Sequence, residues 1–141
     1  MTTDQELSAT IEKYFAFLKS NQTDPVTLYL DSLAASGRRS MRSLIVTAAT
    51  IYEFDGELER MPWPLLQHHH IAQLRTQLQQ QGKSANTINL TLSALRGVMK
   101  ACFNLGLISA DQLMLLNDIK RVRGKRLPSG RSLSQQEIKK L

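Results

Sequence analysis

The sequence predicts an all-α protein, and three observations indicate this fold class. Apolar residues recur at intervals of three and four over most of the 141 residues, which is the spacing of one helix face. No stretch alternates apolar and polar residues between hairpin turn signals, as a half-buried strand does. Helix start and stop signals divide the chain into segments joined by a few residues. We therefore expect a compact helical bundle.

The first three predicted helices lie between residues 3 and 54. Residues 3–6 form a possible capping box ahead of an apolar stripe that ends at Leu18. Asp24 is a suitable N-cap before a proline at the first helical position, and Gly37 is suited to a left-handed C-terminal cap of this second helix. Residues 38–54 then place their apolar side chains on one face, which predicts a third helix.

The later segments also carry clear helix start and stop signals. Two prolines flank Trp63, which we expect in the core, and they open a fourth segment that stops at Gly82. Ser84 caps a long fifth helix that runs to about Leu105 and is closed by a glycine. A shorter helical stretch follows at residues 111–117.

Charge is concentrated at the end of the chain. The 18 Lys and Arg against 12 Asp and Glu give a net charge of +6. Residues 119–141 alone contribute +7, from eight basic residues and one acidic residue. Such a tail is either a contact for polyanions or a solvated linker, and charge alone leaves both open.

The sequence also predicts a division into domains. A second possible capping box at residues 134–137 starts a helix that the chain follows for about two turns, too short to be stable without a packing partner. We therefore predict a helical domain over residues 1–118, a basic linker over 119–133, and the start of a further domain at 134–141.

Several functional classes are not supported by the residues. No apolar run approaches the about 18 to 20 residues of a membrane span, and no signal peptide is visible. A single cysteine, Cys102, forms no internal disulfide and falls on an apolar face, so we expect a small core side chain and a cytoplasmic protein. His68, His69 and His70 fan apart by about 100° each on a helix, so we expect one partly buried histidine and no metal site. No catalytic or cofactor motif is present.

Two predicted helices carry polar faces without acidic residues. On the fifth helix this face holds Asn86, Asn89, Ser93, Arg96, Gly97, Lys100 and Asn104, and on the third it holds Arg38, Arg39, Arg42, Ser43, Thr47 and Thr50. Amides and hydroxyls can bond base edges, and Arg and Lys can neutralise phosphates. The alternative is that both are ordinary solvated faces.

These residues lie in a run that resembles a known family. Residues 82–96 and the following Asn-Leu-Gly-Leu-Ile-Ser at 104–109 resemble the signature helix of the core-binding domain of tyrosine recombinases, the phage-integrase family. Residues 24–54 resemble the opening helix pair of that domain. Residues 122–138 resemble the linker and the first helix of the family's catalytic domain.

The resemblance implies a SAM-like bundle of four or five helices that sits on one side of duplex DNA, with a linker to a catalytic domain on the other side. Its partners would be double-stranded DNA and other recombinase protomers. The catalytic residues would belong to the further domain, so none is assigned here, and this chain alone is expected not to cleave DNA. The resemblance selects Arg39, Arg42, Ser43, Asn86, Thr87, Asn89 and Ser93 as contacts.

Neighbouring cations and polar residues complete the predicted DNA-binding set: Arg38, Lys83, Ser84, Arg96, Lys100, Lys120, Arg121, Arg123, Lys125, Arg126 and Arg131. The tail cations should contact phosphates irrespective of sequence, whereas the uncharged Asn86, Asn89 and Ser93 should affect preference among sequences. An alternative function remains open: a helical protein-interaction domain whose basic tail binds an acidic partner.

Overall fold

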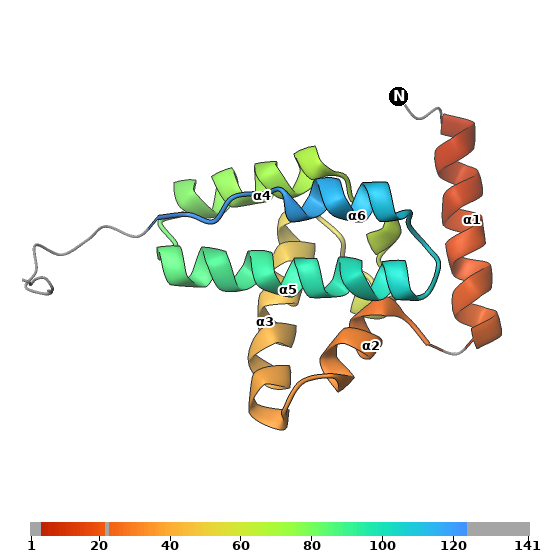
Figure 1. Ribbon diagram of the computed structural model, residues 1–141, viewed down its shortest axis with the longest axis horizontal. Coiled ribbons are helices and arrows are strands. Elements are labelled where there is room, and N and C mark those ends of the chain that lie inside the picture. The colour runs from red at the N-terminus through yellow and green to blue at the C-terminus, as the bar shows by residue number, and fades with distance from the viewer. Residues whose placement is uncertain (1–3, 22, 124–141) are drawn as a thin grey trace, which may run out of the picture.

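The computed structural model describes residues 4–21 and 23–123, and within them every regular element is helical (Figure 1). The elements are α1 (Asp4–Asn21), α2 (Pro25–Asp31), α3 (Ala35–Ile51), α4 (His68–Gln80), α5 (Ala85–Asn104) and α6 (Ala110–Asn117), with short 3-10 helices η1 (Leu58–Arg60) and η2 (Trp63–Leu65) between α3 and α4. The all-α bundle is confirmed. None of these helices is long and apolar enough to cross a membrane.

Helix α5 is the centre of the bundle. It packs against α2, α3, α4 and α6, and its buried face includes Ile88, Leu92, Leu95 and Met99. Figure 1 shows α3 crossing α5, while α6 and the chain that follows it run back along α5 next to α4. Helix α5 is therefore bordered by four other helices, and the side chains that it leaves exposed lie between them.

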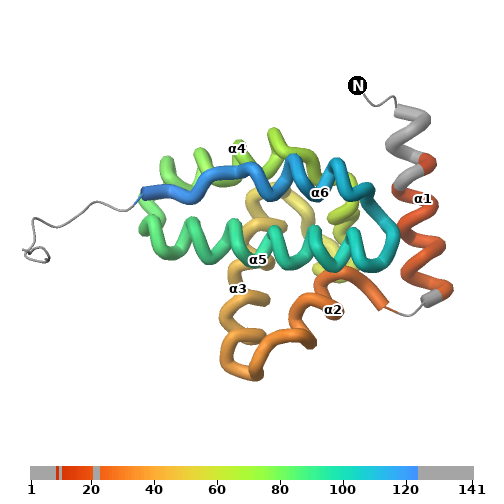
Figure 2. Tube along the Cα trace, in the orientation of Figure 1, coloured from red at the N-terminus to blue at the C-terminus, as the bar shows by residue number. Residues whose placement is uncertain are grey.

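Helix α1 lies at one end of the molecule, as the tube in Figure 2 also shows, and it contacts η2. Its anchor is Tyr14, which is 2% exposed and whose hydroxyl donates a hydrogen bond of 3.2 Å to the carbonyl of Glu59. Trp63 is fully buried, and its ring nitrogen donates to the carbonyl of Leu58 at 3.0 Å. The expectation of a core tryptophan is confirmed.

The predicted starts of α2 and α5 and the predicted ends of α4 and α5 are confirmed by cap geometry. The side chains of Asp24, Ser84 and Ser109 each accept a hydrogen bond from a backbone N–H in the first turn of α2, α5 and α6, at 2.9, 3.1 and 3.1 Å. Gly82 and Gly106 follow α4 and α5 with φ of +78° and +75°, the left-handed conformation that ends a helix. Residue 3, the N-cap of the capping box predicted at residues 3–6, lies outside the described residues.

The predicted end of the second helix is wrong. Helix α2 stops at Asp31, and Gly37 lies inside α3, which begins at Ala35 rather than at Arg38. The guanidinium of Arg38 reaches back to the end of α2, where it donates to the carbonyls of Leu30 and Leu33, both at 3.1 Å. Since backbone N–H groups and the Arg38 side chain together satisfy the last carbonyls of α2, no left-handed glycine is needed there.

Candidate nucleic-acid interface

The longest stretch of the sequence without acidic residues contains α4 and α5. Between Glu59 and Asp111 the sequence contains no Asp or Glu, and this stretch includes both helices in full. The polar side chains that these helices expose are therefore cationic or uncharged. A surface of this kind attracts polyanions and does not repel them locally.

Helix α5 presents one line of exposed polar side chains. Asn86, Ser93 and Lys100 are seven positions apart, close to two turns each, and all three are exposed. No hydrogen bond ties these side chains to another described residue. They remain available to a ligand, as the sequence predicts.

Asn89 does not belong to this exposed line, so its expected availability is wrong. Its Oδ1 atom accepts a hydrogen bond from the backbone N–H of Val122 at 2.7 Å, and its Nδ2 atom donates to the carbonyl of Val122 at 2.8 Å. Both ends of the amide are thus engaged within the molecule. Asn89 holds a distant piece of the chain rather than facing solvent freely.

Arg96 and Gly97 are also covered. The guanidinium of Arg96 donates to the carbonyl of Ile119, and its Nε atom is buried without a hydrogen-bond partner among the described residues. Gly97 lies under the ring of Tyr29, where a Cβ would approach three ring carbons closer than 3.0 Å. The backbone at Gly97 is therefore covered by α2.

At the start of α5, two of the predicted DNA contacts also take part in capping the helix. The hydroxyl of Ser84 caps the helix and donates to the hydroxyl of Thr87 at 3.0 Å. Lys83, just before this cap, is exposed. The amide groups of the first turn and the lysine place positive potential at this end of the helix.

Helix α3 presents three arginines with different environments. Arg38 caps α2, as described above. Arg42 forms an ion pair of 3.5 Å with Glu59, and the two side chains are 48% and 38% exposed. Arg39 is exposed and forms no ion pair with a described residue. Exposed pairs contribute little stability, so Arg42 can exchange Glu59 for a phosphate at small cost.

The hydroxyl residues on this face of α3 also differ in whether their side chains are already hydrogen-bonded within the helix. Ser43 is exposed, and the hydroxyls of Thr47 and Thr50 donate to carbonyls one turn back, at 3.1 and 2.9 Å. Of these three hydroxyls, that of Ser43 keeps its donor free of a described partner.

Residues 119–123, the first part of the predicted linker, pack on the helical domain, and we call them the docked segment. Ile119 is 5% exposed and belongs to the core, and Val122 packs against that core. Lys120, Arg121 and Arg123 are exposed. The boundary predicted at residue 118 therefore falls inside a packed region, while Lys125, Arg126 and Arg131 lie outside the described residues.

The burial of the three histidines and of the cysteine is as the sequence predicts. His68 and His69 are exposed, and His70 is partly buried with its Nδ1 atom accepting from the N–H of Gln67 at 3.0 Å. Among the described residues no group of three or more His, Cys, Asp or Glu is placed to hold a metal ion. Cys102 is fully buried, and burial raises the pKa of its thiol to about 12, which keeps it protonated at neutral pH.

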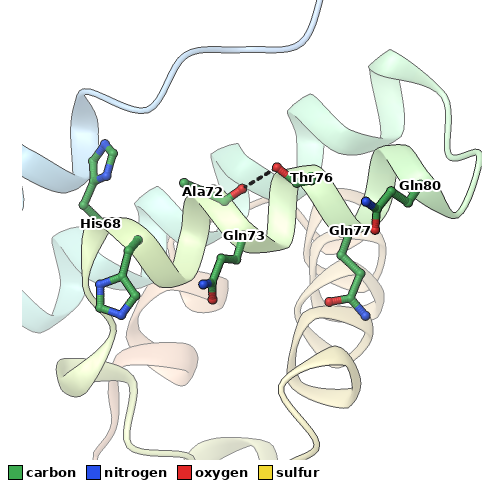
Figure 3. Close-up of a pocket in the computed structure, with 7 residues that line it drawn as sticks. His68, Ala72, Gln73, Thr76, Gln77 and Gln80 are labelled. Atoms are coloured by element: carbon green, nitrogen blue, oxygen red, sulfur yellow. Dashed lines mark hydrogen bonds between the residues drawn. The ribbon is translucent and has the colours of Figure 1, made fainter.

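The sequence interpretation missed one surface, the outer face of α4. An open hollow there is lined only by residues of this helix, among them Gln73, Thr76, Gln77 and Gln80 (Figure 3). Figure 3 shows these side chains pointing outward, apart from the Thr76 hydroxyl, which donates to the carbonyl of Ala72 at 3.2 Å. The spacing of the glutamines was a visible signal for a polar, uncharged face.

Comparisons with known proteins leave the resemblance to tyrosine recombinases resting on the residues quoted for it. No protein-family model matches the chain, and neither the curated proteins nor the solved structures contain a detectable match.

Proposed function

We propose that this chain is a DNA-binding module, the core-binding domain of a site-specific tyrosine recombinase, which clamps duplex DNA at the recombination site. The observation that carries the proposal is the absence of acidic residues between Glu59 and Asp111, across two helices whose exposed polar side chains are amides, hydroxyls, histidines and a lysine. A protein of this kind would act in the cytoplasm, together with other protomers of the recombinase.

Two neighbouring helices supply the proposed contacts. On α5 the line of Asn86, Ser93 and Lys100 offers one amide, one hydroxyl and one cation, and on α3 Arg39 and Arg42 offer planar donors. Amides and guanidinium groups can bond base edges in the major groove, and cations bind phosphates irrespective of sequence.

The proposed role is binding rather than strand cleavage. Burial raises the pKa of Tyr14, Tyr29 and Tyr52, and the hydroxyls of Tyr14 and Tyr52 donate to backbone carbonyls. A phenol in this environment is a poor nucleophile. The chemistry of DNA cleavage is therefore assigned to a further domain.

The test is binding to a labelled duplex as a function of salt. The logarithm of the binding constant should fall linearly with the logarithm of salt concentration, because each neutralised phosphate releases counterions. Arg39→Ala should reduce the slope by about 0.9, and Lys19→Ala, which removes the same charge from α1, should leave it unchanged. Absence of duplex binding, or equal effects of the two variants, would contradict the proposal.

A second candidate function, a protein-interaction domain, is favoured by one observation on α6. Met114 and Leu115 are 69% and 62% exposed, next to Asp111 and Asp118. Large exposed apolar side chains that lie together often mark a protein contact. Replacing both with Ser should leave duplex binding unchanged if DNA is the ligand, so the double variant separates the two functions.

A further inference from the structure

The docked segment is joined to α5 at two points on one side of the helix. The amide of Asn89 bonds the backbone of Val122 in both directions, and the guanidinium of Arg96 bonds the carbonyl of Ile119. Figure 1 shows this part of the chain running back along α5 toward the start of that helix. The segment is therefore antiparallel to α5.

The spacing of these hydrogen bonds matches the geometry of both partners. Asn89 and Arg96 are seven positions apart, about 10.5 Å along the helix axis. Ile119 and Val122 are three positions apart, which spans about 10 Å in an extended chain. Two side chains two turns apart thus fit a straight stretch of backbone, and they fix it at both ends.

In the docked segment the apolar side chains are buried and the cationic side chains are exposed. Ile119 and Val122 face the core, while Lys120, Arg121 and Arg123 remain exposed. No acidic residue of α4 or α5 lies beside them, since neither helix has one. The result is a row of cations on a fixed backbone along the α4–α5 pair.

We propose that Asn89 and Arg96 are positioning residues that dock segment 119–123 on α5 and so hold Lys120, Arg121 and Arg123 as a pre-ordered row of phosphate contacts. The proposal rests on the proposed function and gives Asn89 a role different from base recognition. A fixed backbone loses less conformational entropy when the cations engage phosphates, so docking strengthens binding without any contact from Asn89 to DNA.

Docking can be measured in the full chain without DNA, by hydrogen exchange at the amide of Val122. This N–H donates to Asn89, so Asn89→Ala should accelerate its exchange by about tenfold or more. The matched control is Asn86→Ala, which removes the same side chain from an exposed position of α5. Exchange at the amide of Leu95, in the core, reports whether either variant opens the whole domain.

Binding to a random-sequence duplex between about 50 and 200 mM salt tests the phosphate role. Asn89→Ala should weaken binding to the random-sequence duplex, and it should lower the salt slope by about 0.9 for each phosphate that the released segment no longer neutralises. Asn86→Ala should leave the slope unchanged, because it removes no cation and frees no segment.

The outcomes are distinct. Faster exchange at Val122 with weaker binding to the random-sequence duplex supports the proposal. Unchanged exchange at Val122 shows that Asn89 does not hold the segment, and unchanged affinity for the random-sequence duplex despite faster exchange shows that docking does not aid phosphate binding; either overturns it. A loss of preference among duplexes of different sequence, without a general loss of affinity, would return Asn89 to base recognition. If the unmodified chain binds no duplex, the proposed function fails and the phosphate role with it, while the exchange data still decide the docking.

Discussion

At the residue scale, Arg38 and Arg39 show how neighbouring identical side chains take different roles. Arg38 donates to two carbonyls at the end of α2, whereas Arg39 is exposed and has no ion pair with a described residue. We expect Arg38→Ala to reduce the free energy of unfolding by about 1 kcal/mol, because the carbonyls lose charged donors. Arg39→Ala should change it by less than about 0.5 kcal/mol. Urea unfolding of both variants checks this, and equal losses would contradict the capping role.

His70 predicts a pH dependence of stability. Burial, and then the neighbouring His69, lower the pKa of His70 below its ordinary value of 6.5, and its Nδ1 atom must be unprotonated to accept from Gln67. Because the unfolded chain takes up the proton more readily, this contribution is complete above pH 6.5 and is lost as pH falls through the lowered pKa.

His70→Gln keeps an acceptor at this position and does not titrate. We therefore expect the unfolding midpoint of the wild type to fall more between pH 7.5 and 5 than that of His70→Gln, in urea titrations at each pH. His68→Gln, at an exposed position of the same helix, should follow the wild type. Parallel curves for His70→Gln and the wild type would show that the depressed pKa has no effect on folding.

At the scale of elements, the structure tests which sequence signals are sufficient. Helix α5 was predictable because a serine cap, a continuous apolar stripe and a terminal glycine agree. The end of α2 was not, because Gly37 resembles a stop signal in the sequence, whereas the structure ends α2 with local backbone hydrogen bonds and with Arg38 of the next helix, which donates to the carbonyls of Leu30 and Leu33. A cap that comes from another element has no local signature in the sequence.

The packing of α2 on α5 depends on the absence of a side chain at Gly97. A Cβ there would come closer than 3.0 Å to three ring carbons of Tyr29. We expect Gly97→Ala to lower the free energy of unfolding by about 1 to 2 kcal/mol, since overpacking costs about 1 to 3 kcal/mol and alanine returns up to about 1 kcal/mol of helix propensity.

Gly37→Ala is the matched control for this change. A Cβ at Gly37 meets nothing within 4 Å, so the substitution in α3 should stabilise the protein by up to about 1 kcal/mol. Combining Gly97→Ala with Tyr29→Ala should recover part of the loss, as a coupled pair does. Thermal unfolding of the wild type, Gly97→Ala, Tyr29→Ala and the double variant measures the coupling. A Gly97→Ala chain as stable as Gly37→Ala would show that Tyr29 moves aside freely.

At the scale of the whole molecule, the candidate site was only partly predictable from the sequence. Periodicity located the acid-free faces of α3 and α5, and Asn86, Ser93 and Arg39 are exposed there. It could not show that Asn89 and Arg96 bond a segment more than twenty positions away, because such pairing depends on where α6 directs the chain. The signal available was the pair of apolar residues, Ile119 and Val122, within a basic run.

The extent of the cooperative domain follows from this packing and is testable at two adjacent residues. Ile119 is 5% exposed within the core, whereas Lys120 is exposed. If residues 119–123 fold with the bundle, Ile119→Ala should cost about 2 to 4 kcal/mol, because it leaves a cavity under the segment. Lys120→Ala should stay within about 0.5 kcal/mol. Chemical denaturation gives both values, and a neutral Ile119→Ala would place the end of the cooperative domain at Asp118, with the docked segment detaching before the helices unfold.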